Sequence, residues 1–260
     1  NFAHGDVIMV GAYTIFAAVS MAGMPPAVGI LLSVLVCTVL GIAIEAVAYR
    51  PLRQAASSLV VLITAIGVSY FLQNFALILF GADTKSFTSV VSIPTIKLAG
   101  GDLTISGVTI ATVISCIIIM AALMIFIKKS KSGQAMLAVS EDKDAAQLMG
   151  VNVNKTISLT FAIGSGLAAI AGVLLCSAYP TLSPYTGAMP GIKAFTAAVL
   201  GGIGSLPGAM LGGLILGVAE AQFSGMVNSD YKDVFSFGLL VMILIFRPQG
   251  LLGRPIVAKV

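Results

Sequence analysis

The sequence predicts an all-α integral membrane protein: a polytopic helical bundle of about eight hydrophobic segments, with at least one segment broken or re-entrant. Hydrophobic residues make up 58% of the 260 residues and charged residues only 9%, whereas a soluble domain carries about 25% charged residues. Lipid admits only helices and closed barrels, because every backbone polar group must find its partner inside the protein. The apolar runs at residues 29–48 and 108–127 are continuous and lack the alternation of barrel strands. Both observations favour helices.

Four hydrophobic segments precede the longest hydrophilic stretch of the chain. A membrane-crossing helix needs about 20 mostly apolar residues, and we expect such helices over residues 7–22, 27–49, 58–80 and 108–127. Pro25 and Pro26 form a turn signal after the first segment, and Arg50 and Pro51 close the second. A polar stretch follows the third segment, and Lys128 begins the basic sequence after the fourth.

Four further segments follow the hydrophilic stretch, at residues 156–178, 192–204, 208–223 and 234–246. The segment at 192–204 is too short to cross a hydrocarbon layer of about 30 Å at 1.5 Å per residue. It leads into glycine-rich sequence at 201–208, which a straight helix would not hold. We therefore expect a bent or re-entrant element here, because non-helical backbone at membrane depth must be buried in protein or line a cavity.

Basic residues orient these segments in the membrane. Ten of the fourteen Lys and Arg residues fall within residues 50–53, 128–155 and 247–259. Two predicted helices separate the first cluster from the second, and four separate the second from the third. All three clusters can therefore lie on the cytoplasmic side, as the positive-inside rule requires. The net charge of +4 thus reflects membrane topology and does not indicate nucleic-acid binding.

The 260 residues are expected to form a single transmembrane domain, within which residues 128–155 form a cytoplasmic loop. The chain begins without Met, enters apolar sequence within a few residues and shows no signal peptide with a basic first region. We interpret the sequence as a fragment that lacks an N-terminal helix.

Charged side chains inside the membrane cost about 2.5–3.5 kcal/mol at the bilayer centre and are candidate functional residues. In this chain they are His4, Asp6, Glu45, Lys193 and Glu220. Glu45 is expected to form an ordinary ion pair with Arg50. Lys193 and Glu220 lie near predicted outer ends, and the simplest expectation is that they snorkel to the interface. No subset resembles a catalytic triad, a metal cluster or a carboxylate pair, so we expect no catalytic site and no metal site.

Glycines on the seventh segment form two overlapping small-xxx-small registers, Gly208 with Gly212 and Gly213 with Gly217. Such registers let two helices approach closely, and we expect packing within one subunit, with contact between subunits as the alternative. The glycines at 202 and 204 follow no soluble strand and lack a suitably spaced acidic residue, which excludes a dinucleotide-binding loop.

The hydrophilic stretch contains a predicted amphipathic helix at residues 140–150. Ser140 is the expected N-cap, acidic residues follow it, and Gly150 is the expected stop. Ala145, Leu148 and Met149 share one helical face and form a small apolar patch. The patch is expected to contact a partner protein, with the membrane surface or the chain's own helices as the alternative.

Several motifs resemble one family of bacterial importers. Asp144-Ala145-Ala146 followed by Gly150 resembles the EAA…G cytoplasmic loop of ATP-binding-cassette (ABC) importer permeases, with Asp in place of Glu. The stretches at residues 1–6, 48–53, 148–152, 193–205 and 246–251 resemble the LivH-type permease of branched-chain amino-acid importers. These matches run from end to end of the chain in the same order. The departures are the Asp and the missing N-terminal helix.

The resemblance implies a permease subunit that carries leucine, isoleucine and valine across the bacterial inner membrane. It implies three kinds of partner: an extracytoplasmic amino-acid-binding protein, a second permease subunit (LivM-like or a homologue) and cytoplasmic ATPase subunits. The chain has no phosphate-binding loop of its own, so ATP is expected to bind to the partners, and the chain is expected to need no cofactor and not to be an enzyme. The expected ATPase-coupling residues are Glu141, Asp142, Asp144, Ala145, Ala146, Leu148, Met149 and Gly150.

Candidates for the translocation path are residues at predicted helix breaks, where backbone groups can face a zwitterion: His4, Asp6, Lys193, Gly201, Gly202 and Gly204. One alternative is an ABC permease for urea, short amides or other amino acids. A second is a stand-alone secondary transporter, which would need an ion-coupling or pore-lining set of residues and would leave the amphipathic helix without a role. A membrane enzyme would need clustered catalytic residues at one interface, which this sequence does not offer.

Overall fold

The computed structural model describes residues 1–53, 58–86, 90, 93–98 and 103–253. Of the residues used above for topology, Arg254 and Lys259 lie outside this described part, as do Gly100 to Asp102 of the polar stretch. The chain divides into two compact units, each with its own contacts. Unit 1 comprises residues 1–115 and 125–191, and unit 2 comprises residues 116–124 and 192–260.

All eight predicted hydrophobic segments are helical. Six helices are long and apolar enough to cross a membrane, with bounds His4–Met21, Pro26–Leu52, Leu59–Phe80, Gly107–Lys129, Val153–Ala178 and Leu206–Met226. Two are shorter: α8 (Ala188–Gly201) has 14 residues and α10 (Lys232–Phe246) has 15. At 1.5 Å per residue they reach only about 21–23 Å, less than the hydrocarbon thickness. The predicted short sixth segment is thus confirmed, although its helix begins four residues earlier than expected.

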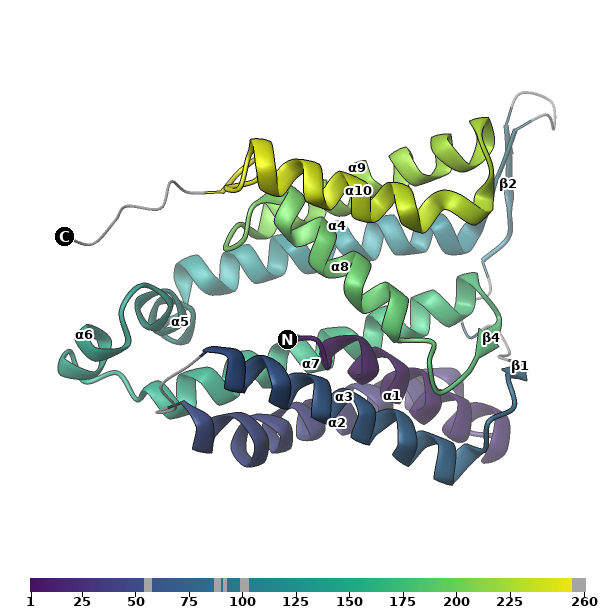
Figure 1. Cartoon of the computed structure of the whole chain (residues 1–260). Coiled ribbons are helices and arrows are strands. Elements are labelled where there is room, and N and C mark those ends of the chain that lie inside the picture. Colours follow the sequence, from purple (N-terminus) through teal and green to yellow (C-terminus); the bar gives the residue numbers. More distant parts are fainter. Residues whose placement is uncertain (54–57, 87–89, 91–92, 99–102, 254–260) are drawn as a thin grey trace. The chain divides into compact units, whose positions relative to one another are not determined.

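Helix α1 (His4–Phe16) forms the centre of unit 1. It packs against α2 (Pro26–Ile44), α3 (Ser58–Phe80) and α7 (Val153–Ala178), and these helices run alongside one another in Figure 1. Small residues make the packing close: a Cβ on Gly172 would lie 2.5 Å from the Ile8 carbonyl oxygen. The Ser33 hydroxyl donates to the Gly11 carbonyl at 2.8 Å. Such contacts stabilise helix pairs in lipid, where apolar burial alone does not.

Two of the spanning helices contain a π-helical turn, in which each backbone bond encloses one residue more than in an α-helix. Ala17–Met21 ends the span that α1 begins, and Glu45–Tyr49 follows α2. A short 3₁₀ turn, Arg50–Leu52, then completes the second span. These wide turns interrupt helices that the hydrophobic pattern alone predicts to be regular.

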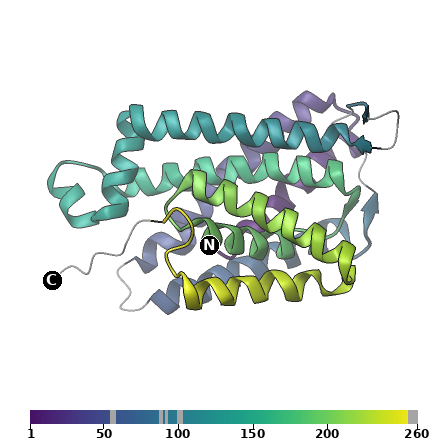
Figure 2. The same ribbon diagram turned by 90° about the horizontal axis from the view of Figure 1, so that it is seen from above.

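Unit 1 has one basic end and one end formed by short strands. At the strand end, β1 (Lys85–Ser86) pairs antiparallel with β4 (Thr181–Leu182), while β2 (Ile96–Leu98) pairs with β3 (Leu103–Ile105). At the basic end, α5 (Lys131–Glu141) and α6 (Lys143–Leu148) extend beyond the start of α7, as Figures 1 and 2 show. Arg53 contacts Asn154 there. The first two basic clusters therefore share one end, as the charge pattern predicts.

Unit 2 contains most of α8, together with α9 (Leu206–Met226) and α10. The expected break lies between α8 and α9, where Gly202 and Gly204 have φ angles of +106° and +90° that favour glycine. A Cβ on Gly201 would lie 1.8 Å from the Gly208 carbonyl oxygen, so α8 and α9 meet backbone to backbone. The Leu251 amide donates to the Leu200 carbonyl at 2.9 Å, which joins the break to the chain after α10.

Candidate functional site

The expected coupling segment is two helices, and the prediction of one helix capped by Ser140 is wrong. Asp142 has an extended conformation (φ −156°, ψ 114°) that ends α5 and begins α6. Its carboxylate accepts hydrogen bonds from the amides of Asp144 and Ala145 at 3.0 Å each, as an N-cap does. The Ser140 hydroxyl instead donates to the Leu137 carbonyl within α5. Asp and Ser are comparable N-cap residues. Asp142 is the cap because its backbone is extended, whereas Ser140 lies inside α5.

Helix α6 presents an exposed apolar pair. The side chains of Leu148 and Met149 are 88% and 84% exposed, and Ala145, Glu141 and Asp144 are exposed as well. Ala146 is the buried residue of this helix and fixes it to unit 1. Gly150 ends the segment with a φ of +83°, as its predicted stop requires. Two large apolar side chains at the tip of a short hydrophilic segment form a surface suited to a protein partner.

Only four residues separate α6 from the long helix α7. The amide of Val151 donates to the Ala146 carbonyl at 3.0 Å, and the Asn152 side chain caps α7 by accepting from the Lys155 amide at 3.0 Å. Each end of the connection is therefore hydrogen-bonded. The connection thus joins α6 directly to the first turn of α7.

The first turns of α7 contact an ionic group around one buried carboxylate, which we call the Glu45 cluster (Glu45, Arg50, Arg53, Asn154 and Ser158). Glu45 is fully buried, and Arg50 approaches its two oxygens at 2.8 and 3.3 Å. Arg53 and the Ser158 hydroxyl also donate to this carboxylate. Arg50 further donates to Ser158 Oγ at 2.8 Å, and Arg53 Nη1 to Asn154 Oδ1 at 2.5 Å. The predicted Glu45–Arg50 ion pair is confirmed as part of this larger cluster.

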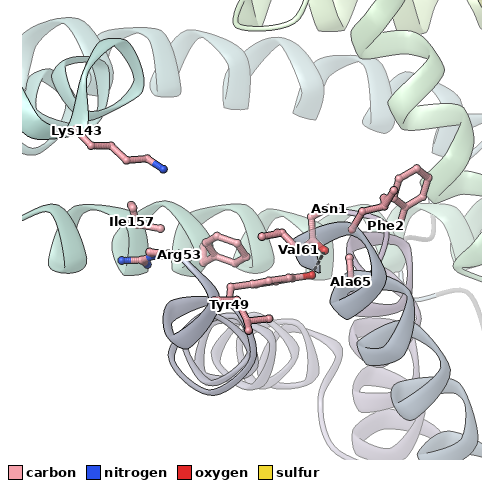
Figure 3. A pocket seen from close by; sticks show the side chains of 11 residues that line it. Asn1, Phe2, Tyr49, Arg53, Val61, Ala65, Lys143 and Ile157 are labelled. Carbon is pink, nitrogen blue, oxygen red and sulfur yellow. Dashed lines mark hydrogen bonds between the residues drawn. The ribbon is translucent and has the colours of Figure 1, made fainter. Parts of the chain in front are cut away.

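A cavity of about 610 Å³ lies beside the Glu45 cluster at the basic end of unit 1. Figure 3 shows Arg53, Lys143 from α6 and Ile157 from α7 at one side of it, and Tyr49 with its hydroxyl hydrogen-bonded to Asn1 at the other. Most of its apolar lining comes from α3 and α7 (Val61, Leu62, Ala65, Ile157 and Phe161), and Phe2 and Leu52 add to it. The cavity separates α3 from the first turns of α7 at this level.

His4 and Asp6 lie on the first turns of α1 in unit 1. Asp6 is 1% exposed, and its carboxylate accepts hydrogen bonds from the Ser69 hydroxyl and, at 3.0 Å, from the Gln73 amide. Both donors are neutral and belong to α3. His4 is half-buried and lies 3.9 Å from the position of a Cβ on Gly164 of α7. These two candidates for the translocation path thus lie at the contact of α1 with α3 and α7.

Lys193 belongs to unit 2, where it forms ion pairs that the sequence analysis did not predict. Its Nζ lies 2.9 Å from Glu220 Oε1 and 2.8 Å from Asp233 Oδ1, and the buried Ser236 hydroxyl also contacts Glu220. These four residues form the Lys193 cluster, which connects α8, α9 and α10. Two carboxylates share one ammonium, because mutual attraction in a partly desolvated site outweighs the hydration of separate charges.

The three glycine candidates have different surroundings within unit 2. The Gly201 carbonyl accepts from the Leu252 amide, and the Gly202 amide donates to Ala198, each at 2.9 Å. A Cβ on Gly204 would meet no atom within 4 Å. Their role in a translocation path stays a prediction. On α9, the register of Gly208 and Gly212 packs against α8 as expected for contact inside one subunit, whereas Gly217 faces open space.

Sequence reasoning found Arg50 beside Glu45 but missed the other polar partners of Asp6, Glu45 and Glu220. Ser69 and Gln73 lie four residues apart in an apolar helix, as do Asn154 and Ser158, and such i, i+4 polar pairs were a usable signal. Asp233 and Ser236, three residues apart at the start of α10, are the corresponding pair in unit 2. The spacing indicates a polar face; which carboxylate the face meets depends on tertiary packing.

Comparison with known proteins gives consistent matches along the chain. The family model described as branched-chain amino acid transport system / permease component matches residues 1–244. The high-affinity branched-chain amino acid transport system permease protein LivH of Salmonella typhimurium is 46% identical over all of this chain and 87% of its own length. LivH of Escherichia coli K12 is 45% identical with the same coverage. BraD of Pseudomonas aeruginosa, with the same description, is 45% identical over all of this chain and 88% of its own length. No solved structure matches the chain.

Proposed function

Because the chain belongs to the family of permease components of branched-chain amino acid transport systems, we propose that it forms part of the membrane path through which leucine, isoleucine and valine enter a bacterial cell across the inner membrane. The transport is driven by ATP, and both units act together as one permease domain. The chain contributes helices and a coupling surface; the chemical step belongs to other subunits.

The partners follow from this role. ATPase subunits bind and hydrolyse ATP on the cytoplasmic side, so the chain itself needs no cofactor and is not an enzyme. A binding protein delivers the amino acid on the outer side. A second permease subunit, LivM-like or a homologue, completes the path. The lipid bilayer surrounds the assembly.

The observation that carries the proposal is the exposed α6 segment. Leu148 and Met149 lie at the tip of a helix pair beyond the basic end of unit 1, where the positive-inside rule places the cytoplasm. Large apolar side chains exposed to water at such a tip favour a protein partner. A stand-alone secondary transporter would have no use for this surface.

One alternative within the same class concerns the substrate. A permease of this kind could carry other amino acids, urea or short amides, since specificity in an importer depends on its binding protein as well as on its membrane path. Full-length identity of 45–46% to three permeases described as branched-chain amino acid transporters favours the branched-chain substrates. Uptake of radiolabelled leucine, isoleucine, valine and urea by the assembled complex distinguishes them.

The experiment that tests the proposal is co-purification from host membranes in mild detergent. Leu148→Glu with Met149→Glu places two charges in the exposed patch without altering the buried Ala146. The matched control is Met226→Glu with Val227→Glu, which changes two adjacent exposed apolar residues at the far end of α9. We expect wild type and control to retain ATPase subunits and the α6 variant to lose most of them. If stably folded wild type retains no ATPase, the importer proposal is wrong and a secondary transporter becomes the better explanation.

A further inference from the structure

The Glu45 cluster joins the end of the second span to the helix that follows the coupling segment. Glu45, Arg50 and Arg53 all belong to the π and 3₁₀ turns after α2 or directly follow them. Asn154 and Ser158 lie one turn apart on α7. The cluster therefore crosses from one helix to the other at the basic end of unit 1, close to α6.

Opposite charges and hydrogen bonds hold this contact together. One carboxylate meets two guanidinium groups, and the polar atoms of Asn154 and Ser158 receive the remaining guanidinium N–H bonds that the structure assigns. Charge-assisted hydrogen bonds are stronger than neutral ones, and a guanidinium fixes direction as well as distance. The hydroxyl of Ser158 both accepts from Arg50 and donates to Glu45, so it lies inside the ionic group.

Above the cluster, α7 and α2 pack closely against one another. A Cβ on Gly41 would lie 2.2 Å from Ser165 Oγ and 2.8 Å from the Phe161 carbonyl oxygen. Closely packed helices respond to a push by shifting together, because the interface has little free volume. On the α3 side, by contrast, the 610 Å³ cavity leaves room beside the first turns of α7.

From these contacts we propose that Glu45 is a positioning residue for transport: through its cluster, movement of α6 carries α7 and α2 together. This inference rests on the proposed function, since it assumes that ATPase subunits move α6. In this scheme, a displacement of α6 moves the first turns of α7 through the short connection at residues 149–152. The hydrogen bonds of Asn154 and Ser158 to the two arginines and Glu45 then move the end of the second span with α7.

The test removes the α7 side of the cluster and leaves the Glu45–arginine ion pairs intact. Asn154→Ala with Ser158→Ala does so without leaving a buried charge unbalanced. The control is Thr160→Ala, whose hydroxyl bonds only to the Thr156 carbonyl within α7 in the described part of the chain. The full complex, with ATPase subunits and binding protein, is reconstituted in proteoliposomes, and leucine uptake and ATP hydrolysis are measured together.

We expect the double variant to hydrolyse ATP within about twofold of wild type and to take up at least fivefold less leucine per ATP; the control matches wild type. An unchanged ratio of uptake to hydrolysis in the double variant would overturn the inference, because a purely structural cluster lowers both rates together through loss of folded complex. Should the double variant not assemble, Ser158→Ala alone is measured, with an expected twofold fall in the ratio and the same refuting result. Wild-type complex that neither transports leucine nor hydrolyses ATP contradicts the proposed function itself, which separates the two failures.

Discussion

Replacing Lys193 with Met should weaken the contact of α8 with α9 and α10 in unit 2. The change removes the one ammonium between Glu220 and Asp233 but keeps a flexible apolar side chain of similar length. Among the described residues, Glu220 and Asp233 then have no cation paired with them. The three side chains are 22%, 18% and 38% exposed, so the site is neither fully buried nor fully hydrated.

The size of the effect lies between two limits. Exposed ion pairs contribute about 0.2–1 kcal/mol, and removing one partner of a buried pair costs about 3–5 kcal/mol. Because Lys193 is partly exposed but meets two carboxylates within 3 Å, we expect a loss of about 2 kcal/mol in the free energy of unfolding. For a chain of this size that corresponds to a fall in Tm of about 4–8 °C.

Thermal unfolding in detergent, followed by the loss of soluble folded protein, measures this fall. The matched control is Lys232→Met, the same substitution at an exposed residue next to Asp233, whose ammonium forms no ion pair in the described part of the chain. Glu220→Gln should cost less than Lys193→Met, since Asp233 still pairs with the ammonium. The double variant should lose less than the sum of the two single variants, by more than about 0.5 kcal/mol. Equal Tm values for the Lys193 and Lys232 variants, or strict additivity, would refute the reasoning.

Three other substitutions test other parts of the molecule. Asp6→Leu leaves the Ser69 hydroxyl without its carboxylate acceptor and the Gln73 amide with only its 3.4 Å bond to Ser69 Oγ, at about 1–3 kcal/mol. Asp6→Asn keeps an acceptor, so melting temperatures should fall clearly only for Leu. Gly212→Val places a Cβ 2.1 Å from the Ala197 carbonyl oxygen and should cost about 1–3 kcal/mol, while Gly217→Val, with no atom within 4 Å, should be neutral by the same assay. Asp142→Ala removes the cap of α6, worth about 1 kcal/mol, and should speed hydrogen exchange of the Asp144 and Ala145 amides; equal exchange in Ser140→Ala and Asp142→Ala would contradict the assigned cap.

The spanning helices could be predicted because the length of an apolar run decides whether a helix can cross the bilayer. About 20 mostly apolar residues fill a bilayer, and clusters of charged or turn-forming residues end the run. Helix α3 runs from Ser58 to Phe80, as its sequence predicts. The start of α7 was placed three residues late because Val153 to Lys155 are mixed in character, and the helix begins instead where Asn152 can cap it.

The ionic clusters could be predicted only in part, because their members lie far apart in sequence. Glu45 and Arg50 are five residues apart, so their pairing was visible in the sequence. Ser158 is more than a hundred residues from Arg50, and only the packing of α7 against α2 brings them together. The π turn at Glu45–Tyr49 was equally hidden, since the hydrophobic pattern of a π turn and of an α-helix barely differ over five residues.

The three carboxylates inside apolar helices are satisfied in three ways, and the differences separate their roles. Glu45 has two guanidinium groups as neighbours, so its charge balances a surplus of positive charge at the basic end of unit 1. Glu220 shares a single ammonium with Asp233, which connects three helices by one side chain. Asp6 accepts only from the neutral donors Ser69 and Gln73 among the described residues. Loss of the Glu45 charge therefore leaves two guanidinium groups, 42% and 17% exposed, without their carboxylate, whereas loss of the Asp6 charge leaves no paired cation among the described residues. The Glu45 arrangement is therefore better suited to a contact between two helices that must stay together while the transporter moves. Its side chains are held by opposite charges as well as by hydrogen bonds.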